Sequence, residues 1–125
     1  MMSDANLPLA EWSRVGGVAV VDVLHKEILG PEAAAALGEQ LGSLLRSGEV
    51  RQLLDFSRTQ LISSTVFGAL LSFWKQVEAA GGELKICGMN PSVRLGADIL
   101  CLGEFIPIHD DKAAALAAFS GGVGT

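Results

Sequence analysis

The sequence predicts a single α/β domain, in which a mixed and mainly parallel β-sheet carries an N-terminal β-hairpin and about four helices. Short apolar runs alternate with helical patterns along the chain, which is typical of parallel strands joined by helical crossovers. Gly16 and Gly17 separate the first two apolar runs, as the turn of a β-hairpin requires. At 125 residues, 50% of them hydrophobic, the chain can bury one core but is too short for two domains.

The N-terminal half contains a hairpin, a helix and a strand. Residues 12–15 and 18–24 are expected to pair, and the second run is nearly continuous in valine, as expected for a strand covered on both faces. Pro31 opens a helix that ends near Gly48, because proline is favoured at the first helical position and glycine beyond the last. Residues 50–56 form the next strand. The expected core stripe of the helix consists of Leu37, Leu41, Leu44 and Leu45.

The C-terminal half repeats the alternation of helix and strand. A helix is expected over residues 65–79 and a buried strand over residues 84–87. Asn90 followed by proline predicts the capped start of a third helix that reaches about residue 100. Residues 105–108 are expected to form a last short strand, and Asp111 to cap an alanine-rich terminal helix. No internal repeat or linker interrupts this order.

Composition and charge exclude several classes of function. The net charge is −5 and the pI is about 4.9, so binding to nucleic acid or to an anionic membrane surface is not expected. The longest uncharged stretch, residues 61–74, is shorter than the ~18 residues that a membrane span needs. Residues 1–8 contain no basic side chain and do not resemble a secretory leader, so we expect a cytoplasmic protein.

The residues that commonly carry metal or acyl-transfer chemistry are few and isolated. Cys87 and Cys101 lack the spacing of a metal or redox motif, and with only two histidines no metal site or cofactor is expected. Ser64, His109 and the following aspartate supply the residue types of a hydrolytic triad, but the Gly-x-Ser-x-Gly elbow is absent. We therefore expect no enzyme.

A phosphoacceptor receiver domain is a further alternative, since Asp22, Asp55 and Lys85 supply its residue types. Asp22 and Lys85 both lie inside predicted strands. We therefore expect the paired acids at the strand ends, which such a domain requires, to be missing. Asp55 has two open interpretations, as a turn carboxylate that binds nearby backbone N–H groups or as part of the rim of a site around Ser64.

Three hydroxyl side chains, Ser63, Ser64 and Thr65, stand where the second long helix begins. Hydroxyls at this position commonly cap the helix by accepting a backbone N–H. A phosphate on Ser64 would meet unpaired N–H groups and the positive end of the helix dipole. The two roles are compatible, and the residue types alone leave both open.

The same helix has more apolar surface than one core stripe needs. One face consists of Val66, Leu70, Phe73 and Val77. The other consists of Phe67, Leu71 and Trp74. Both faces belong to the core, or else the second face is a docking surface for a partner beside the serine cluster, with the first and third helices left free.

Several motifs follow one another in a specific order. They are the glycine hairpin at 16–17, Leu-Leu-Asp-Phe-Ser at 53–57, Ile-Ser-Ser at 62–64, Gly-Ala-Leu at 68–70, the run 80–88, Asn-Pro-Ser-Val at 90–93 and Phe-Ile-Pro-Ile at 105–108. In this order they resemble the STAS domain, the fold of anti-sigma factor antagonists. The resemblance implies a STAS domain over residues 11–119, between tails at 1–10 and 120–125.

The resemblance also implies a function in the regulation of transcription. In that family an unphosphorylated serine at the start of the second helix lets the protein bind an anti-sigma factor, which is also a serine kinase. Phosphorylation by this partner releases it. The acceptor position falls on Ser64, with Ser63 and Thr65 as weaker candidates, and a phosphatase is a further candidate partner. The expected partner contacts are Asp55, Ser63, Thr65, Phe67, Leu71 and Trp74.

The chain departs from the commonest family pattern at two positions beside Ser64. Ser63 stands where aspartate is usual, and Val66 stands where glycine is usual. An alternative function therefore stays open, in which the domain is a STAS scaffold or a small-ligand-binding module that is not phosphorylated.

Overall fold

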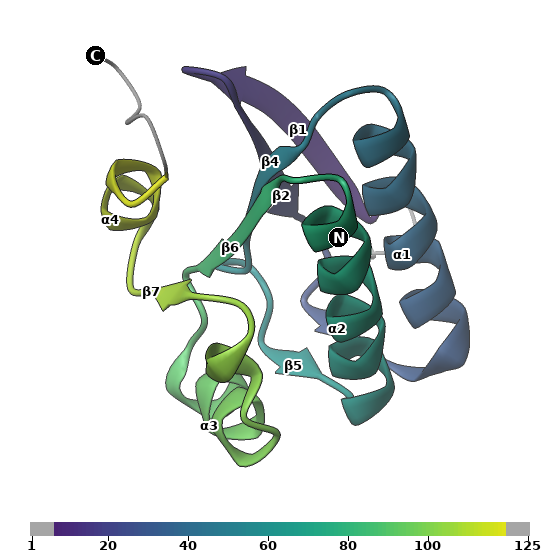
Figure 1. The fold of residues 1–125 in the computed structure, drawn as a ribbon. Coiled ribbons are helices and arrows are strands. Elements are labelled where there is room, and N and C mark those ends of the chain that lie inside the picture. Colours follow the sequence, from purple (N-terminus) through teal and green to yellow (C-terminus); the bar gives the residue numbers. More distant parts are fainter. Residues whose placement is uncertain (1–6, 120–125) are drawn as a thin grey trace.

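The computed structural model describes residues 7–119, which form one five-stranded sheet with helices on both faces (Figure 1). The strand order is β1-β2-β4-β6-β7. β1 is antiparallel to β2, and every other neighbouring pair is parallel. The strands are β1 (Ala10–Val15), β2 (Val18–Val23), β4 (Arg51–Asp55), β6 (Glu83–Cys87) and β7 (Ile108–His109). The predicted fold class, including the N-terminal hairpin, is confirmed.

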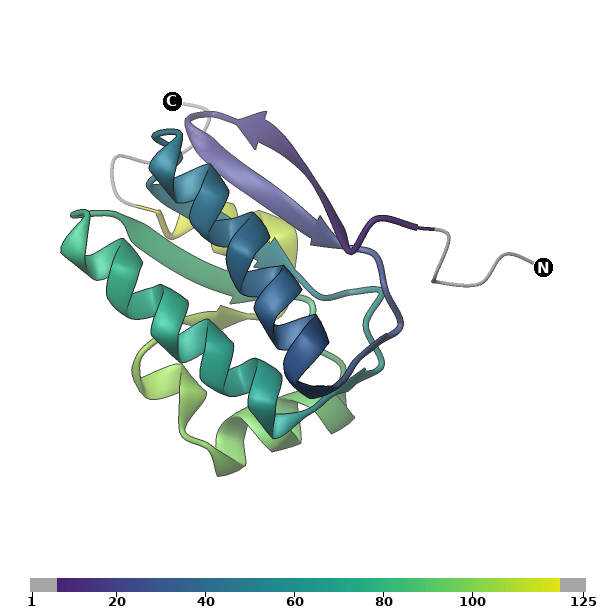
Figure 2. The ribbon, with the colours of Figure 1, turned by 90° about the vertical axis from the view of Figure 1, so that its right-hand side faces the viewer.

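Helices α1 (Gly30–Arg46) and α2 (Ser64–Ala79) lie side by side on one face of the sheet, and α4 (Lys112–Ala117) lies on the other (Figures 1 and 2). After β6, the chain forms α3 (Pro91–Ile99) and the short 3-10 helix η2 (Leu102–Glu104). The expected caps are present. Asn90 Oδ1 accepts a hydrogen bond from Val93 N at 2.7 Å, and Asp111 Oδ1 accepts one from Ala114 N at 2.8 Å.

The core is divided by the sheet into a larger and a smaller cluster. The larger one lies under α1 and α2 and includes Val21, Val23 and Leu54. The smaller one lies under α4 and consists of Val18, Val20, Leu53, Cys87, Ala115 and Phe119. This division confirms why the second strand is nearly all valine, since alternate side chains of β2 enter opposite clusters.

Several predicted boundaries were wrong. β1 begins at Ala10, which pairs with Val23, so this strand starts two residues earlier than the hairpin pattern predicted. Residues 105–107 are not a strand; β7 begins at Ile108, because Pro107 has no N–H and contributes only its carbonyl, to Ile86 N at 2.9 Å. Most of the predicted tails, residues 1–6 and 120–125, lies outside the described residues.

The sequence did not predict a second, two-stranded parallel sheet. It pairs β3 (Glu27–Ile28) with β5 (Leu61–Ile62), and these strands precede α1 and α2 respectively. The small sheet therefore holds the starts of the two long helices next to each other. Within residues 7–119, no helix combines the length and the apolar character needed to cross a membrane.

Cys87 is fully buried in β6, whereas Cys101 is exposed after α3. Burial, with a smaller contribution from the Asp55 charge, raises the pKa of the Cys87 thiol from 9.0 to about 12. The thiol form of Cys87 is thus favoured by the fold, and its contribution to stability is lost as the pH rises from about 9 towards 12. Neither cysteine has a disulfide partner.

Alkylation should distinguish the two thiols. In the folded protein at pH 8, iodoacetamide should add one group, at Cys101, because Cys87 is neither accessible nor ionised. In urea it should add two. Intact mass and peptide mapping measure this, and Cys101→Ser should leave the folded protein unmodified. Equal alkylation rates of the two thiols in the folded protein would show that Cys87 is not buried in β6 as described.

Candidate functional site

Ser63 connects the starts of the two long helices. Its backbone N–H donates to Ile28 O at 3.1 Å, and its Oγ accepts a hydrogen bond from Gly30 N at 3.1 Å. Ser63 is the N-cap residue of α2, but its side chain makes no capping bond to that helix. The expected capping role is therefore wrong for Ser63, because the hydroxyl is already used by the first residue of α1.

Ser64 is the first residue of α2 and is exposed to solvent. Its hydroxyl makes no hydrogen bond to any part of the chain that the structure describes. The N–H groups of Val66 and Phe67 both donate to Ser63 O, at 3.0 and 3.2 Å, while those of Ser64 and Thr65 have no acceptor within residues 7–119. A free hydroxyl thus lies beside two free N–H groups at the positive end of a 16-residue helix.

Ser64 also lines an apolar pocket of about 220 Å³ between α2 and α3. Its walls are formed with Ser64 by Ile62, Phe67, Gly96, Ile99 and Leu100. Gly96 permits the close approach of the two helices, since a Cβ on this residue would lie 3.3 Å from the Phe67 ring. The hydroxyl therefore borders an apolar surface to which two helices contribute.

The predicted second face of α2 is not a solvent-exposed stripe. Phe67 is only 2% exposed and belongs to the core, while Leu71 and Trp74 are partly buried against it. The Trp74 ring lies 5.3 Å from the Phe105 ring, centroid to centroid. Phe67 is thus removed as a partner contact, because α3 covers it. The core face of Val66, Leu70, Phe73 and Val77 is confirmed.

Asp55 is a turn carboxylate, which confirms one of its two interpretations. It is largely buried at the end of β4, and its Oδ1 accepts a hydrogen bond from Ser57 N at 2.9 Å. Its Oδ2 lies 3.4 Å from Lys112 Nζ. Because both carboxylate oxygens have partners elsewhere, we do not place Asp55 at the rim of the Ser64 site.

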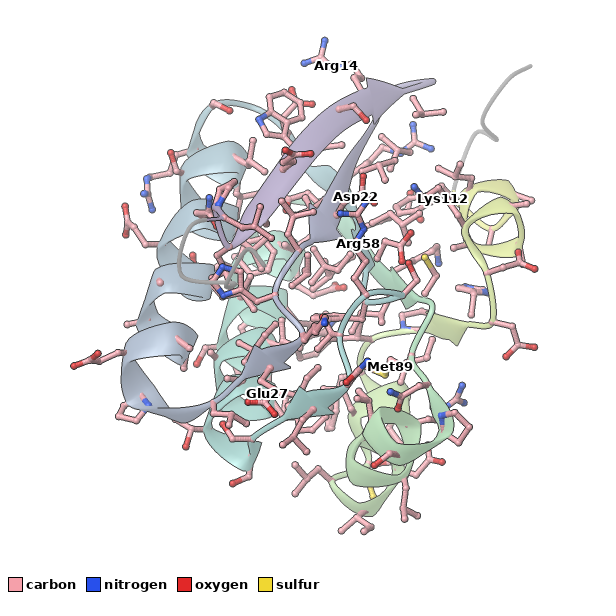
Figure 3. The ribbon with its side chains drawn as sticks, turned by 180° about the vertical axis from the view of Figure 1, so that it is seen from behind. Arg14, Asp22, Glu27, Arg58, Met89 and Lys112 are labelled. Carbon is pink, nitrogen blue, oxygen red and sulfur yellow. The ribbon has the colours of Figure 1, made fainter. Side chains whose placement is uncertain are left out.

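Two acidic residues do meet at the strand ends, which corrects the expectation that this pair is missing. The register of β2 and β4 sets Asp22 opposite Asp55, and Lys112 Nζ of α4 lies 3.2 Å from Asp22 Oδ1 (Figure 3). Although desolvation acts in the opposite direction, the two carboxylates raise the pKa of Lys112. The predicted lysine, Lys85, instead lies over the Phe119 ring. The cluster attaches α4 to the sheet.

Gly88 packs directly against Asp55 in the cluster of Asp22, Asp55 and Lys112. Its φ of +78° is unfavourable for other residues, and a Cβ here would lie 2.8 Å from Asp55 Oδ1 and 3.0 Å from Ser57 N. The conformation and the absence of a side chain are both needed for Asp55 to reach its turn.

The two histidines lie apart from the serine cluster. His25 Nε2 is hydrogen-bonded with Leu7 O at 2.9 Å, and His109 pairs with Cys87 in the sheet. No contact in the described chain joins either ring to Ser64, so the triad arrangement does not form. Within residues 7–119 no three His, Cys, Asp or Glu side chains are grouped to hold a metal.

Comparison with known proteins gives one family. The STAS domain matches residues 19–115. A Bordetella bronchiseptica protein, BtrV, named as a candidate anti-sigma factor antagonist, is 34% identical over 86 residues, 69% of this chain and 74% of that protein.

Solved structures agree in fold. An anti-sigma factor antagonist from Mycobacterium paratuberculosis has a TM-score of 0.78 at 20% identity, over 88% of this chain and 92% of that one. Phosphorylated SpoIIAA of Bacillus has a TM-score of 0.63 at 18% identity, over 85% of this chain and 96% of that one. At these identities the likeness shows the fold alone.

Gly88→Ala should lower the free energy of unfolding by about 2 kcal/mol or more, since it combines backbone strain with overlap at Asp55. Gly81→Ala is the matched control, because Gly81 also has a positive φ (+73°) but nothing within 4 Å of its added Cβ. Urea unfolding of both variants measures the difference. Equal losses would mean that the overlap is not real.

Trp74→Ala should lower the free energy of unfolding by about 2 kcal/mol, because it removes the contact with Phe105 and part of the core wall. Leu95→Ala, at a residue that is 61% exposed, should change stability by less than about 0.5 kcal/mol. Thermal and urea unfolding test the pair. An unchanged stability in Trp74→Ala would show that Trp74 does not support the fold and is available to contact a partner.

Proposed function

The chain belongs to the STAS domain family, and on that premise we propose that it is an anti-sigma factor antagonist that acts by partner switching. In its unphosphorylated form it binds an anti-sigma factor that is also a serine kinase, and phosphorylation of Ser64 releases that partner. A phosphatase restores the binding form. The protein itself catalyses no reaction and works in the cytoplasm.

One observation carries this proposal: Ser64 presents a free hydroxyl at the first turn of α2. A kinase can reach the side chain because Ser64 is exposed, and the hydroxyl has no internal hydrogen bond to break. The unpaired N–H groups of Ser64 and Thr65 and the helix dipole are suited to receive a phosphate once it is attached. The modified state can then form without rearrangement of the fold.

The switch is electrostatic. A phosphate adds about −1.5 to −2 charge at neutral pH, next to a pocket whose other walls are almost entirely apolar. A partner that fits a neutral hydroxyl and aliphatic side chains would have to desolvate this charge, and it would lose affinity as a result. The same phosphate is compatible with the free protein, where water solvates it.

The two departures from the commonest family pattern, at Ser63 and Val66, leave the Ser64 side chain accessible. Ser63 is half-buried and bonded to Gly30, and Val66 is fully buried in the core. Neither side chain occupies the surface around Ser64. This arrangement supports Ser64 over Ser63 as the acceptor and leaves Thr65, which is also exposed, as the other candidate.

The alternative of a small-ligand-binding module has one observation in its favour. A polar cavity of about 590 Å³ lies among the loops that follow β2, β4 and β6, and its lining includes Lys26, Arg58 and Asn90. This volume suits a small polar molecule. The cavity does not include Ser64, so ligand binding here and partner switching do not exclude each other.

Binding assays with charge variants test the switch. We expect Ser64→Asp to weaken binding to the cognate anti-sigma kinase by at least about tenfold, or ~1.4 kcal/mol, and Ser64→Ala to bind it constitutively. Ser72→Ala is the matched control, because Ser72 is an exposed serine of the same helix that lies away from its first turn, and this variant should behave as the wild type. The purified kinase-type anti-sigma factors of the source genome serve as partners, in calorimetry and in intact-mass analysis with ATP. Equal affinities of Ser64→Asp and Ser64→Ala would reject the mechanism.

A further inference from the structure

α3 has two apolar faces, and only one of them is buried. Val93 and Ala97, four residues apart, face the core. Leu95 and Ile99, also four residues apart, are 61% and 71% exposed, and Leu100 at the end of the helix is 42% exposed. Two large aliphatic side chains on the nine-residue helix and a third at its C-cap are thus exposed to solvent, and neither folding nor solubility accounts for this exposure.

The exposed face of α3 reaches Ser64 at the C-terminal end of the helix. Ile99 and Leu100 line the same pocket as the Ser64 side chain. Leu61, which lies in β5 just before α2, is 45% exposed and directly precedes Ile62 of the pocket wall. We call Leu61, Leu95, Ile99 and Leu100 the α3 patch. In Figure 1, α3, β5 and the start of α2 lie at the same end of the molecule.

The charged side chains near the α3 patch include slightly more acidic than basic residues. Glu27 is the register partner of Leu61, and Glu32 lies in the first turn of α1, whose first residue is bonded to Ser63. Asp98 is paired with Arg94 on α3, so this pair adds no net charge. The basic Lys26 precedes Glu27, which leaves a small acidic excess near the patch. A partner with basic residues around an apolar centre would complement this surface.

We infer that the α3 patch, with Ser64 at its edge, is the docking surface for the anti-sigma factor, which inserts an apolar side chain beside Ile99 and places basic residues opposite Glu27 and Glu32. The inference rests on the proposed function and names the surface it uses. It also explains why phosphorylation would strongly lower the affinity for the partner, because a phosphate on Ser64 would lie in the wall of the pocket that the partner fills. Helix α3, and not the Phe67 face of α2, then carries the apolar contact.

Exposed positions allow this surface to be tested without damage to the fold. Ile99→Glu and Leu95→Glu should each weaken binding to the purified anti-sigma kinase at least tenfold. Val15→Glu is the matched control: Val15 is also aliphatic and 39% exposed, but it lies in β1, and its change should alter affinity less than twofold. Circular dichroism melting should show all three variants as stable as the wild type within a few degrees.

Cys101 gives a second readout in the unmodified chain, since it follows Leu100 and is the exposed thiol. Saturating anti-sigma kinase should slow its alkylation at least tenfold, and Ser64→Asp should abolish this protection. Loss of binding in Ser64→Asp, with wild-type affinity in Ile99→Glu and Leu95→Glu, would overturn the inference but keep the proposed function. No binding by the wild-type protein to any kinase-type anti-sigma factor of its genome would overturn both.

Discussion

The parallel pairing of β2, β4 and β6 is the constraint on which the rest of the structure depends. Because these strands run in the same direction, the loops that follow them leave the sheet at one end. The first two loops pair briefly as β3 and β5, and the Ser63 hydroxyl then bonds the start of α1 to the start of α2. The site around Ser64 is therefore a product of sheet topology, although all three of its hydroxyl residues are consecutive in the sequence.

Ser63 shows how a change in a motif can alter a role without altering the site. The resemblance to the STAS family places an aspartate at this position, where a carboxylate would bring charge next to Ser64. In this chain a neutral hydroxyl is directed to Gly30 N, and the free N–H groups at the start of α2 are left to Ser64 and Thr65. The helix end thus keeps its unpaired donors, which an N-cap side chain would otherwise have occupied.

Much of the fold was predictable because its signals are local. Paired glycines, the Asn90 and Asp111 caps and the valine-rich β2 each depend on a few neighbouring residues, and all were confirmed. The errors involve distant partners. Apolar spacing identifies two faces on α2, but whether Phe67 becomes exposed depends on how α3 packs against that helix. The ion pairs of Lys112 with Asp22 and Asp55 likewise depend on strand register and on the position of α4, which sequence spacing does not encode.

The two edges of the sheet have a further consequence for the behaviour of the protein in concentrated solution. An exposed strand edge is a template for pairing with a second chain, and half of this chain is apolar. β1 carries exposed Glu11 and Arg14, with Arg14 held in an ion pair to Glu49, and charged side chains on an edge strand oppose pairing. β7 at the other edge is only two residues long and offers too few hydrogen bonds to nucleate a fibril. The charges of β1 matter for this reason, because Trp12 and Val15 on the same edge strand are also exposed. Leu95 and Ile99, by contrast, lie on a helix, where self-association has no ladder of backbone hydrogen bonds to extend.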